Sequence, residues 1–269
     1  MRSLMNEFSL LSLNTFGIPF FLGWGRLARL ASELDNNGTA IICLQEIQQN
    51  AYVSLLARSL TTFPHRVVYP HIYAPKGGLG TYSRLPFSWQ GFEVYKDRGL
   101  RWLITYSDWA LYKGALIAKT KVQELEIVIL NTHLNANYTG VWHRNNPLAR
   151  VQHRQVQQLT RLVEEVSEDA FVIVCGDFNF PRDTFLYEEL ISQNRLSDPL
   201  RDDPRPTYRP FPLVPSKWNT SLDYVLYRVP HEPKFQVQAD IVVFEDTTKK
   251  YAFQRFLTDH CALTLQINW

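Results

Sequence analysis

Short runs of apolar residues recur along the whole chain, and Gly, Pro, Asn or Asp residues bound them. Runs of this length that are rich in Val, Ile, Leu and aromatic residues are typical of buried β-strands. We expect strands at Phe8–Leu13, Ala40–Leu44, Val67–Tyr69, Leu79–Tyr82, Ala115–Ala118, Ile127–Leu130, Phe171–Cys175, Tyr224–Tyr227, Val237–Phe244 and Cys261–Ile267.

Helical spacing of apolar residues lies between some of these runs. It predicts helices at Trp24–Leu34, Leu148–Val166 and Thr184–Gln193, the last of which follows Asp183, a suitable cap. The order is strand, helix, strand, helix, a series of strands, and then helix and strands again. This order fits neither a purely parallel sheet nor an all-β sandwich, so we predict a layered α/β fold with mixed sheets.

The composition excludes several classes of protein. Hydrophobic residues make up 45% and charged residues 20% of the 269 residues, which excludes intrinsic disorder. No linker of low complexity divides the chain, so we predict a single domain over residues 1–269, with the proline-rich stretch 199–218 as a surface loop. The net charge of +2 is too small to indicate nucleic-acid binding by itself.

Two further features bear on the compartment. No apolar run reaches the ~20 residues of a membrane-spanning helix, and the N-terminus lacks a signal-peptide pattern. Cys43, Cys175 and Cys261 each lie in an apolar run and have no metal-site spacing, so we expect small buried side chains in a reducing compartment. We expect a cytoplasmic or peripheral membrane location.

Polar residues stand at the ends of successive apolar runs, where open α/β sheets place ligands and catalytic groups. They are Asn14, Glu46, His133, Asp177, Asn179, Asp223, Asp259 and His260. The carboxylate and amide oxygens suit Mg²⁺ or Mn²⁺ better than zinc. Together with a carboxylate-oriented histidine, such a cation can hydrolyse a phosphodiester.

Six strings strengthen this hypothesis because they occur in one order along the whole chain. They are SLNTFG (12–17), LQE (44–46), NTHL (131–134), GDFN (176–179), SLDYV (221–225) and TDH (258–260). The ordered set resembles the endonuclease/exonuclease/phosphatase superfamily. That resemblance implies a four-layer, deoxyribonuclease-like sandwich of two mixed β-sheets flanked by helices, with Mg²⁺ at a cleft that hydrolyses a phosphate ester.

The resemblance also implies a role for each matching residue. Glu46 is expected to be the principal metal carboxylate, with Asn14 beside it, and Asp177 and Asn179 to position the water and the phosphate. His260 is expected to be the general base, oriented by Asp223, with Asp259 supporting the metal or phosphate. His133 is expected to donate to the phosphoryl oxygens. Many nucleases of the superfamily carry an acidic residue where this chain has Phe16, which weakens a nuclease interpretation.

Further strings resemble the neutral sphingomyelinases, namely GGLGTYSRLP (77–86), SDWALYKGAL (107–116) and THLNANY (132–138). In that branch an aspartate and a lysine five residues apart are linked to substrate binding. The resemblance therefore assigns Asp108 and Lys113 to the substrate, although such a pair on a surface hairpin is often simply solvated.

Two other segments have alternative interpretations. Phe20, Phe21 and Trp24 form an interfacial anchor if they are exposed and pack the first helix if they are buried. The stretch 127–163 has arginines but no Asp or Glu, which suits either an anionic partner or an ordinary solvated helix face.

The leading hypothesis is a Mg²⁺-dependent phospholipase C-type hydrolase that releases ceramide and phosphocholine from sphingomyelin. We expect a monomer that acts on a phospholipid and touches the membrane surface transiently, with nucleic acid a less favoured partner. The alternatives are a nuclease acting on abasic or single-stranded DNA and an inositol-phosphate phosphatase. A non-enzymatic scaffold is disfavoured, because every expected catalytic position carries a competent residue.

Overall fold

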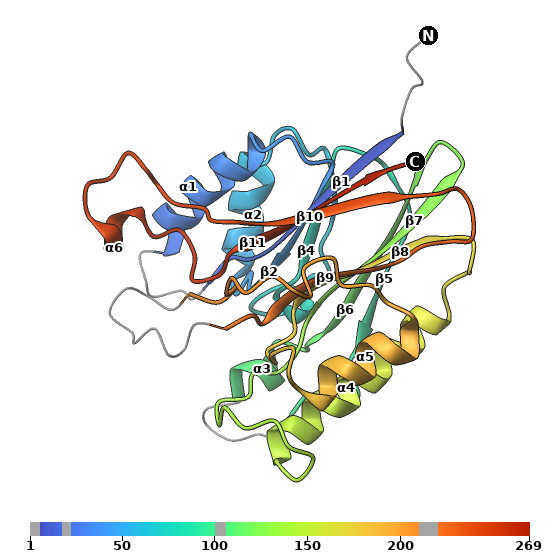
Figure 1. The fold of residues 1–269 in the computed structure, drawn as a ribbon. Coiled ribbons are helices and arrows are strands. Elements are labelled where there is room, and N and C mark those ends of the chain that lie inside the picture. Colours follow the sequence, from blue (N-terminus) through green and yellow to red (C-terminus); the bar gives the residue numbers. More distant parts are fainter. Residues whose placement is uncertain (1–5, 18–22, 100–105, 210–219) are drawn as a thin grey trace.

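The computed structural model describes residues 6–17, 23–99, 106–209 and 220–269. Two mixed β-sheets face each other (Figure 1). The six-stranded sheet has the order β10 (Gln236–Val242), β11 (Ala262–Asn268), β1 (Glu7–Asn14), β2 (Ile41–Gln45), β4 (Gly80–Ser83) and β3 (His65–Val67). The five-stranded sheet has the order β5 (Phe87–Val94), β6 (Gly114–Val122), β7 (Leu125–His133), β8 (Phe171–Asp177) and β9 (Asp223–Arg228).

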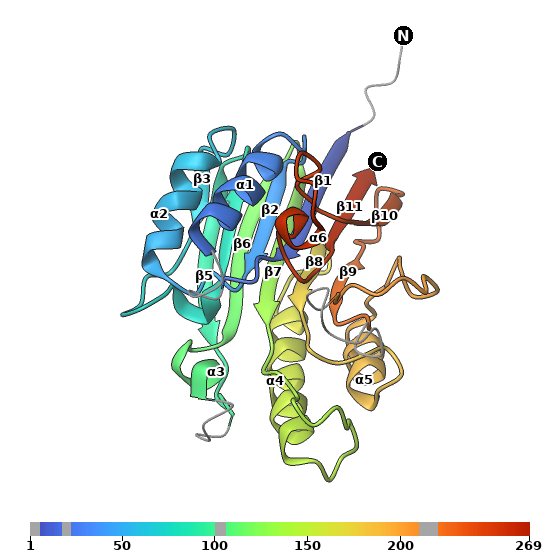
Figure 2. The same ribbon diagram turned by 90° about the vertical axis from the view of Figure 1, so that its left-hand side faces the viewer.

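Helices cover the outer face of each sheet (Figures 1 and 2). The helices α1 (Gly23–Asp35) and α2 (Asn50–Ser59) pack on the six-stranded sheet, and α4 (Pro147–Glu164) and α5 (Phe185–Asn194) pack on the other. Three shorter elements lie in connections: η1 (Lys76–Gly78), α3 (Tyr106–Ala110) and α6 (Ala252–Arg255). The result is the predicted four-layer sandwich.

The strands are apolar on both faces because each face is covered. In β8, Val172 and Val174 face the α4 and α5 layer, whereas Phe171, Ile173 and Cys175 face the opposite sheet. A strand buried on both sides reads as a continuous apolar run, which is why the sequence identifies it. All three cysteines are buried and free, as predicted.

Each sheet contains one parallel pair at its centre. The pair β1–β2 is joined through α1 and the pair β7–β8 through α4, while the other neighbours are antiparallel. In the first pair Asn14 lies opposite Gln45, and in the second His133 lies opposite Asp177. The carboxyl ends of all four central strands therefore lie at one end of the sandwich.

Some elements differ from the sequence prediction. β5 was not predicted, since it is an edge strand with no buried residue and half of its residues exposed, and α2 was not predicted either. The cap of α5 is Thr184, whose hydroxyl accepts from the backbone N–H of Tyr187, and not Asp183. Of the proline-rich stretch, residues 199–209 are largely irregular and 210–218 lie outside the described residues. No helix in the described ranges combines the length and apolarity needed to cross a bilayer.

Candidate active site

A cavity of about 700 Å³ opens at the carboxyl ends of the two parallel pairs. Eight of the predicted site residues line it: Glu46, Asp108, Lys113, His133, Asp177, Asn179, Asp259 and His260. The other two, Asn14 and Asp223, lie directly behind this lining and hydrogen-bond to Asp177 and His260. The structure thus brings all of these residues together from segments far apart in the sequence.

Asn14 joins the two sheets at the centre of the site. Its fully buried side-chain nitrogen donates to Glu46 Oε1 at 3.1 Å and to Asp177 Oδ2 at 2.9 Å. Its oxygen accepts from the backbone N–H of Phe16 at 3.0 Å. The amide nitrogen, and not the oxygen, therefore faces the carboxylates and orients them.

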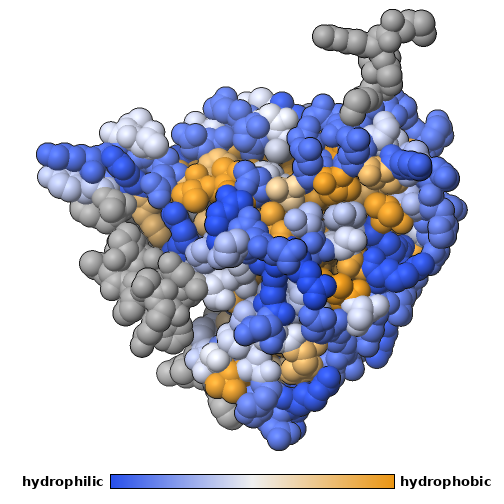
Figure 3. Space-filling view, viewed as in Figure 1, coloured by the Kyte–Doolittle hydropathy of each residue, from blue (hydrophilic) through white to orange (hydrophobic). Residues whose placement is uncertain are grey.

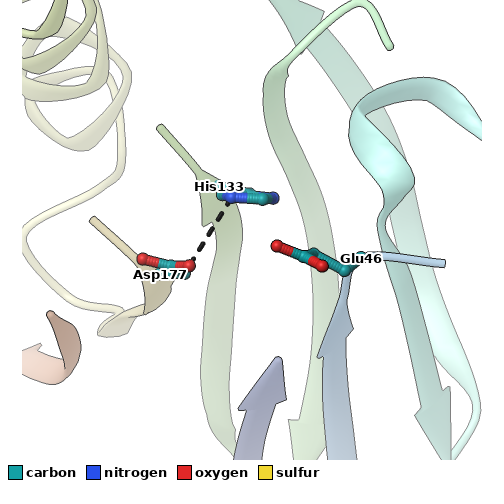
Figure 4. A group of neighbouring side chains, drawn as sticks. All are labelled: Glu46, His133 and Asp177. Atoms are coloured by element: carbon teal, nitrogen blue, oxygen red, sulfur yellow. Dashed lines mark ion pairs between the residues drawn. The ribbon is translucent and has the colours of Figure 1, made fainter. Parts of the chain in front are cut away.

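Glu46 sits where β2 ends, in a left-handed conformation with φ of 57°. A non-glycine residue in this region is uncommon, and such conformations cluster at functional sites. Gly17 passes so close that a Cβ there would lie 1.7 Å from the Glu46 carbonyl oxygen. Figure 4 shows the Glu46 side chain pointing towards His133 and Asp177 from the opposite sheet, and their ligand atoms lie within 4.8 Å of one another.

This cluster suits a divalent cation. Burial and the neighbouring Asp223 carboxylate raise the pKa of Asp177 to about 7. Burial also raises the pKa of Asp259 to about 7, and its Oδ1 atom is buried without a donor among the described residues. His260 Nε2 lies 3.9 Å from an oxygen of each carboxylate, and a cation held by oxygen ligands would add further positive charge beside them. The structure thus contains a candidate divalent-metal site between the sheets.

Lys113 and Asp108 form a buried ion pair, so a solvated surface pair is excluded. Lys113 is fully buried, and its Nζ atom lies 2.9 Å from Asp108 Oδ1. The same nitrogen donates to the Leu134 carbonyl at 2.8 Å and lies 3.0 Å from His133 Nε2. Three partners occupy all three ammonium protons, so this arrangement leaves none for a further acceptor.

His133 is held in its neutral form. Burial, and then the charges of Lys113 and His260, lowers the pKa of His133 well below its ordinary value. Because the Lys113 ammonium can only donate, Nε2 accepts and the ring proton resides on Nδ1. The buried Nδ1 atom has no partner in the described part of the chain. It is therefore a donor that the protein itself does not satisfy.

His260 is oriented by Asp223, as the sequence predicted, at 2.8 Å between Nδ1 and Oδ2. Thr207 steadies the carboxylate by donating to the same oxygen at 2.7 Å. Burial alone would lower the pKa of His260, but the carboxylates of Asp223, Asp259 and Asp177 raise it well above its ordinary value. The ring is therefore protonated at neutral pH unless another positive charge enters the site.

Asn179, two residues after the end of β8, adopts a left-handed conformation with φ of 55°. Its backbone N–H donates to Asp177 Oδ1 at 2.9 Å, and its side chain donates to the Leu134 carbonyl at 3.0 Å. The tight turn lets Asp177 and Asn179 line the same cavity.

Sequence reasoning missed several residues around the site. Thr207 is one, and Tyr138, Trp142 and Tyr208 line the cavity as well. Tyr138 ends the string THLNANY, but no local pattern marks the others, because their contacts with the site join distant segments.

The structure bears on the aromatic segment that includes Trp24 and on the arginine-containing stretch 127–163. Trp24 is 49% exposed, while Phe20 and Phe21 lie outside the described residues. In the arginine stretch, Arg154 pairs with Asp97 and Arg144 lies 3.9 Å from Glu189. Part of the positive charge there is consequently neutralised.

The sequence matches the endonuclease/exonuclease/phosphatase family over residues 11–260, which run from β1 to His260 of the candidate site. The chain belongs to this family. The ordered strings predicted this membership.

One similar protein is protein angel of Drosophila melanogaster. It is 28% identical over 189 residues, which cover 66% of this chain and 50% of that protein. The chain thus spans about half the length of the curated relative it matches.

Solved structures share the fold along nearly the whole chain. Sphingomyelinase C from Streptomyces griseocarneus has a TM-score of 0.72 and 19% identity and covers 97% of this chain and 99% of its own. D. rerio TDP2 complexed with a single-strand DNA product has a TM-score of 0.73 and 17% identity, with coverages of 98% and 99%. A mutant of Staphylococcus aureus beta toxin with bound magnesium ions has a TM-score of 0.76 and 15% identity, with coverages of 96% and 99%. At these identities the likeness establishes the fold alone.

Proposed function

We propose that this protein is a Mg²⁺-dependent phospholipase C-type phosphodiesterase that hydrolyses sphingomyelin or a related phospholipid to ceramide and phosphocholine. The candidate metal site and the family membership support the reaction. The choice of substrate depends on the chemistry of the cavity walls.

The charge of the cavity lining favours a head group with a single phosphate and a positive charge. Four carboxylates line the cavity, and the Asp108 carboxylate pairs with the one lysine, Lys113. No arginine belongs to the lining within the described ranges, whereas nucleic-acid sites neutralise several phosphates with Lys and Arg. Half-exposed Tyr138, together with Trp142 and Tyr208, offers the aromatic faces that bind quaternary ammonium groups.

The same argument disfavours an inositol phosphate, because several phosphates would bring many negative charges beside four carboxylates. This lining charge is the observation that carries the proposal.

Glu46 and Asp177 would hold the cation, with His133 beside them, and Mn²⁺ suits the same oxygen ligands. When bound, a divalent cation stabilises negative charge on a phosphoryl oxygen and lowers the pKa of water. His260, oriented by Asp223, would take the proton from the attacking water. For this step the ring must be neutral, which an added positive charge in the site favours.

The roles of Lys113 and His133 follow from their hydrogen bonds. Lys113 would fix the His133 tautomer by donating to Nε2, which leaves the proton on Nδ1 for a phosphoryl oxygen. Asn179 would position the water or the phosphate beside Asp177. Lys113 would therefore serve the substrate indirectly, through His133.

We also propose that the monomer touches the membrane surface only transiently. Ile72 and Tyr73 are strongly exposed, and their loop is held by Asn50, which donates to the Ile72 carbonyl at the start of α2. Figure 3 shows apolar residues on the viewed face in separate patches, without one continuous apolar surface. Such a surface suits brief contact better than insertion.

The test offers sphingomyelin vesicles and abasic or single-stranded DNA in parallel, with Mg²⁺ and with EDTA. We expect phosphocholine release that requires Mg²⁺ and little DNA cleavage. Intact sphingomyelin together with nicked DNA would overturn the lipid assignment and favour the nuclease alternative.

A further inference from the structure

Helix α4 buries two glutamines on the face that it packs against the five-stranded sheet. Gln152 and Gln155 are fully buried, alongside apolar residues such as Val156 and Leu159. Burying an amide is unfavourable unless it is hydrogen-bonded, so each must have a specific partner. Neither side chain lines the cavity.

Gln152 ties together the two segments that follow β7 and β8. Its Nε2 atom donates to the Asn135 carbonyl at 2.8 Å and to the Asn179 carbonyl at 2.8 Å. Asn179 is the left-handed residue that closes the turn after Asp177. One buried side chain thus holds that turn against the segment that follows His133.

Gln155 holds the N–H of a peptide whose carbonyl faces the site. Its Oε1 atom accepts from the Asn135 backbone N–H at 3.0 Å, and its Nε2 atom donates to the Asp97 carbonyl at 2.9 Å. The Asn135 N–H and the Leu134 carbonyl belong to the same planar peptide and point in opposite directions. Fixing the N–H therefore aims the carbonyl.

The Leu134 carbonyl is a shared acceptor of the site. It receives Lys113 Nζ at 2.8 Å and Asn179 Nδ2 at 3.0 Å. If this peptide rotated, Lys113 would lose a partner on one side and Asn179 on the other. The orientation of both side chains thus depends on a peptide that Gln155 holds from behind.

We propose that Gln152 and Gln155 are positioning residues of the active site. Gln155 aims the Leu134 carbonyl at Lys113 and Asn179, and Gln152 holds Asn179 in its left-handed conformation. The inference deepens the proposed hydrolase function and relies on it for the effect on rate, whereas the positioning itself can be measured without any reaction.

The test compares Gln152→Met and Gln155→Met with Gln158→Met. Gln158 lies on the same helix and also makes two bonds to backbone, from the Lys96 N–H at 2.9 Å and to the Val94 carbonyl at 3.0 Å, but both lie outside the site. It is a control for the loss of a side-chain amide that bonds to backbone from the same helix, although its side chain is only partly buried. The variants are assayed for kcat and KM on the soluble diester bis(4-nitrophenyl) phosphate with Mg²⁺, and for amide hydrogen exchange.

We expect the Gln152 and Gln155 variants to lose about 10- to 100-fold in kcat, as outer partners of metal sites typically do. Their amide exchange should accelerate in residues 133–137 and 177–180, whereas Gln158→Met should accelerate exchange only near residues 94–96. Gln155→Glu keeps the acceptor for the Asn135 N–H and, with its carboxyl protonated, one donor for the Asp97 carbonyl or Asn135 Oδ1, so at acidic pH it should recover part of the kcat that Gln155→Met loses.

If all three Met variants change kcat alike, or if exchange at 133–137 and 177–180 stays at the wild-type rate, the positioning role is refuted. If a Met variant fails to fold, Gln155→Glu and its exchange pattern decide the question. A wild type that leaves the diester intact with Mg²⁺ contradicts the proposed function, and the exchange result still decides whether the glutamines position the site.

Discussion

Lys113 is buried in a way that its position in the sequence does not predict. The sequence alone allowed a solvated pair with Asp108, but both side chains are buried and the ammonium has no free proton. Removing only one partner of a buried ion pair leaves an uncompensated charge, which costs about 3–5 kcal/mol. The pair therefore acts as a unit.

We predict that Lys113→Met lowers the free energy of unfolding by about 3–5 kcal/mol, because it strands the Asp108 carboxylate. The double variant Lys113→Met with Asp108→Asn keeps an acceptor for the Ala136 N–H and should recover much of this loss while remaining impaired in hydrolysis, since His133 loses the donor at Nε2. Urea denaturation measures the first effect and phosphocholine release the second. A double variant no more stable than Lys113→Met would show that the pair is not coupled.

His260 and Asp223 are predicted to act together. General-base assistance contributes about 10² to 10⁴-fold, so His260→Ala should lose at least that factor in kcat/KM. Adding Asp223→Asn to His260→Ala should cost little more, because the orienting carboxylate then has no ring to orient. Losses that simply multiply would mean that the two residues act separately.

The pH profile should distinguish a base from an acid at His260. A base must be neutral, so its pKa sets the acidic limb of the kcat/KM profile. Asp223→Asn removes the carboxylate that raises this pKa most, and the acidic limb should therefore move to lower pH while the maximal rate falls. Movement of the alkaline limb instead would assign His260 the role of an acid.

At the scale of single residues, the sequence predicts which side chains belong to the site better than it predicts their hydrogen-bond partners. Residues at strand ends, such as Glu46 and Asp177, are predictable because the strand pattern and the ordered strings mark them. Thr207 and Gln152 are not, because each acquires its role from a backbone or side chain that folding brings close.

Among the elements, α1 anchors two loops of the site through a single side chain. Arg26 is buried and donates to the carbonyls of Thr15, at 2.8 Å, and of Phe16 and Leu257. These carbonyls lie directly after β1 and just before Asp259 and His260 in the chain. Burial lowers the pKa of Arg26, so the hydrogen bonds must offset its desolvation.

We predict that Arg26→Lys lowers the free energy of unfolding by about 1–3 kcal/mol, because one ammonium cannot span all three carbonyls and leaves a buried acceptor unsatisfied. Activity should fall as well, since the loops carrying Asn14 and His260 lose their common anchor. Arg29→Lys on the same helix is the control, because Arg29 is partly exposed and pairs with Asp246. Equal losses for the two variants, measured by urea denaturation, would contradict this role.

The sequence predicts central elements better than peripheral ones. β8 is recognisable because it is covered on both faces, and α4 because its apolar face has helical spacing. β5 and α2 are not predicted, because the first has no buried residue and the second is short and has no side-chain cap at Gln49. Their conformations depend on tertiary contacts, which a local pattern does not record.

On the scale of the whole molecule, the candidate metal site joins the two sheets. Glu46 follows β2 of the six-stranded sheet, whereas Asp177 ends β8 of the five-stranded sheet. A cation bound by both would bind the folded protein and not the unfolded chain, and would stabilise it by mass action.

We predict that Mg²⁺ at about 100 times its Kd stabilises the protein by about 2.7 kcal/mol and raises the Tm by about 5–10 °C. Glu46→Gln should abolish most of this rise and most of the activity, because it removes a charged ligand with little change in volume. Thermal scans with Mg²⁺ and with EDTA measure the shift, and Glu33→Gln, at an exposed position in α1, is the control. A Tm unaffected by Mg²⁺ in the wild type would contradict the site.

The two parallel strand pairs belong to two similar strand–helix–strand units. The unit β1–α1–β2 contributes Asn14 and Glu46 from its strand ends, and β7–α4–β8 contributes His133 and Asp177 from the same positions. Each unit thus contributes two side chains to the centre, and other segments add the remaining site residues, such as Asp223 and His260. If residues 1–84 and 85–269 were produced as separate fragments, hydrolysis would return only when they reassociate, so turnover itself would report the assembly of the sandwich.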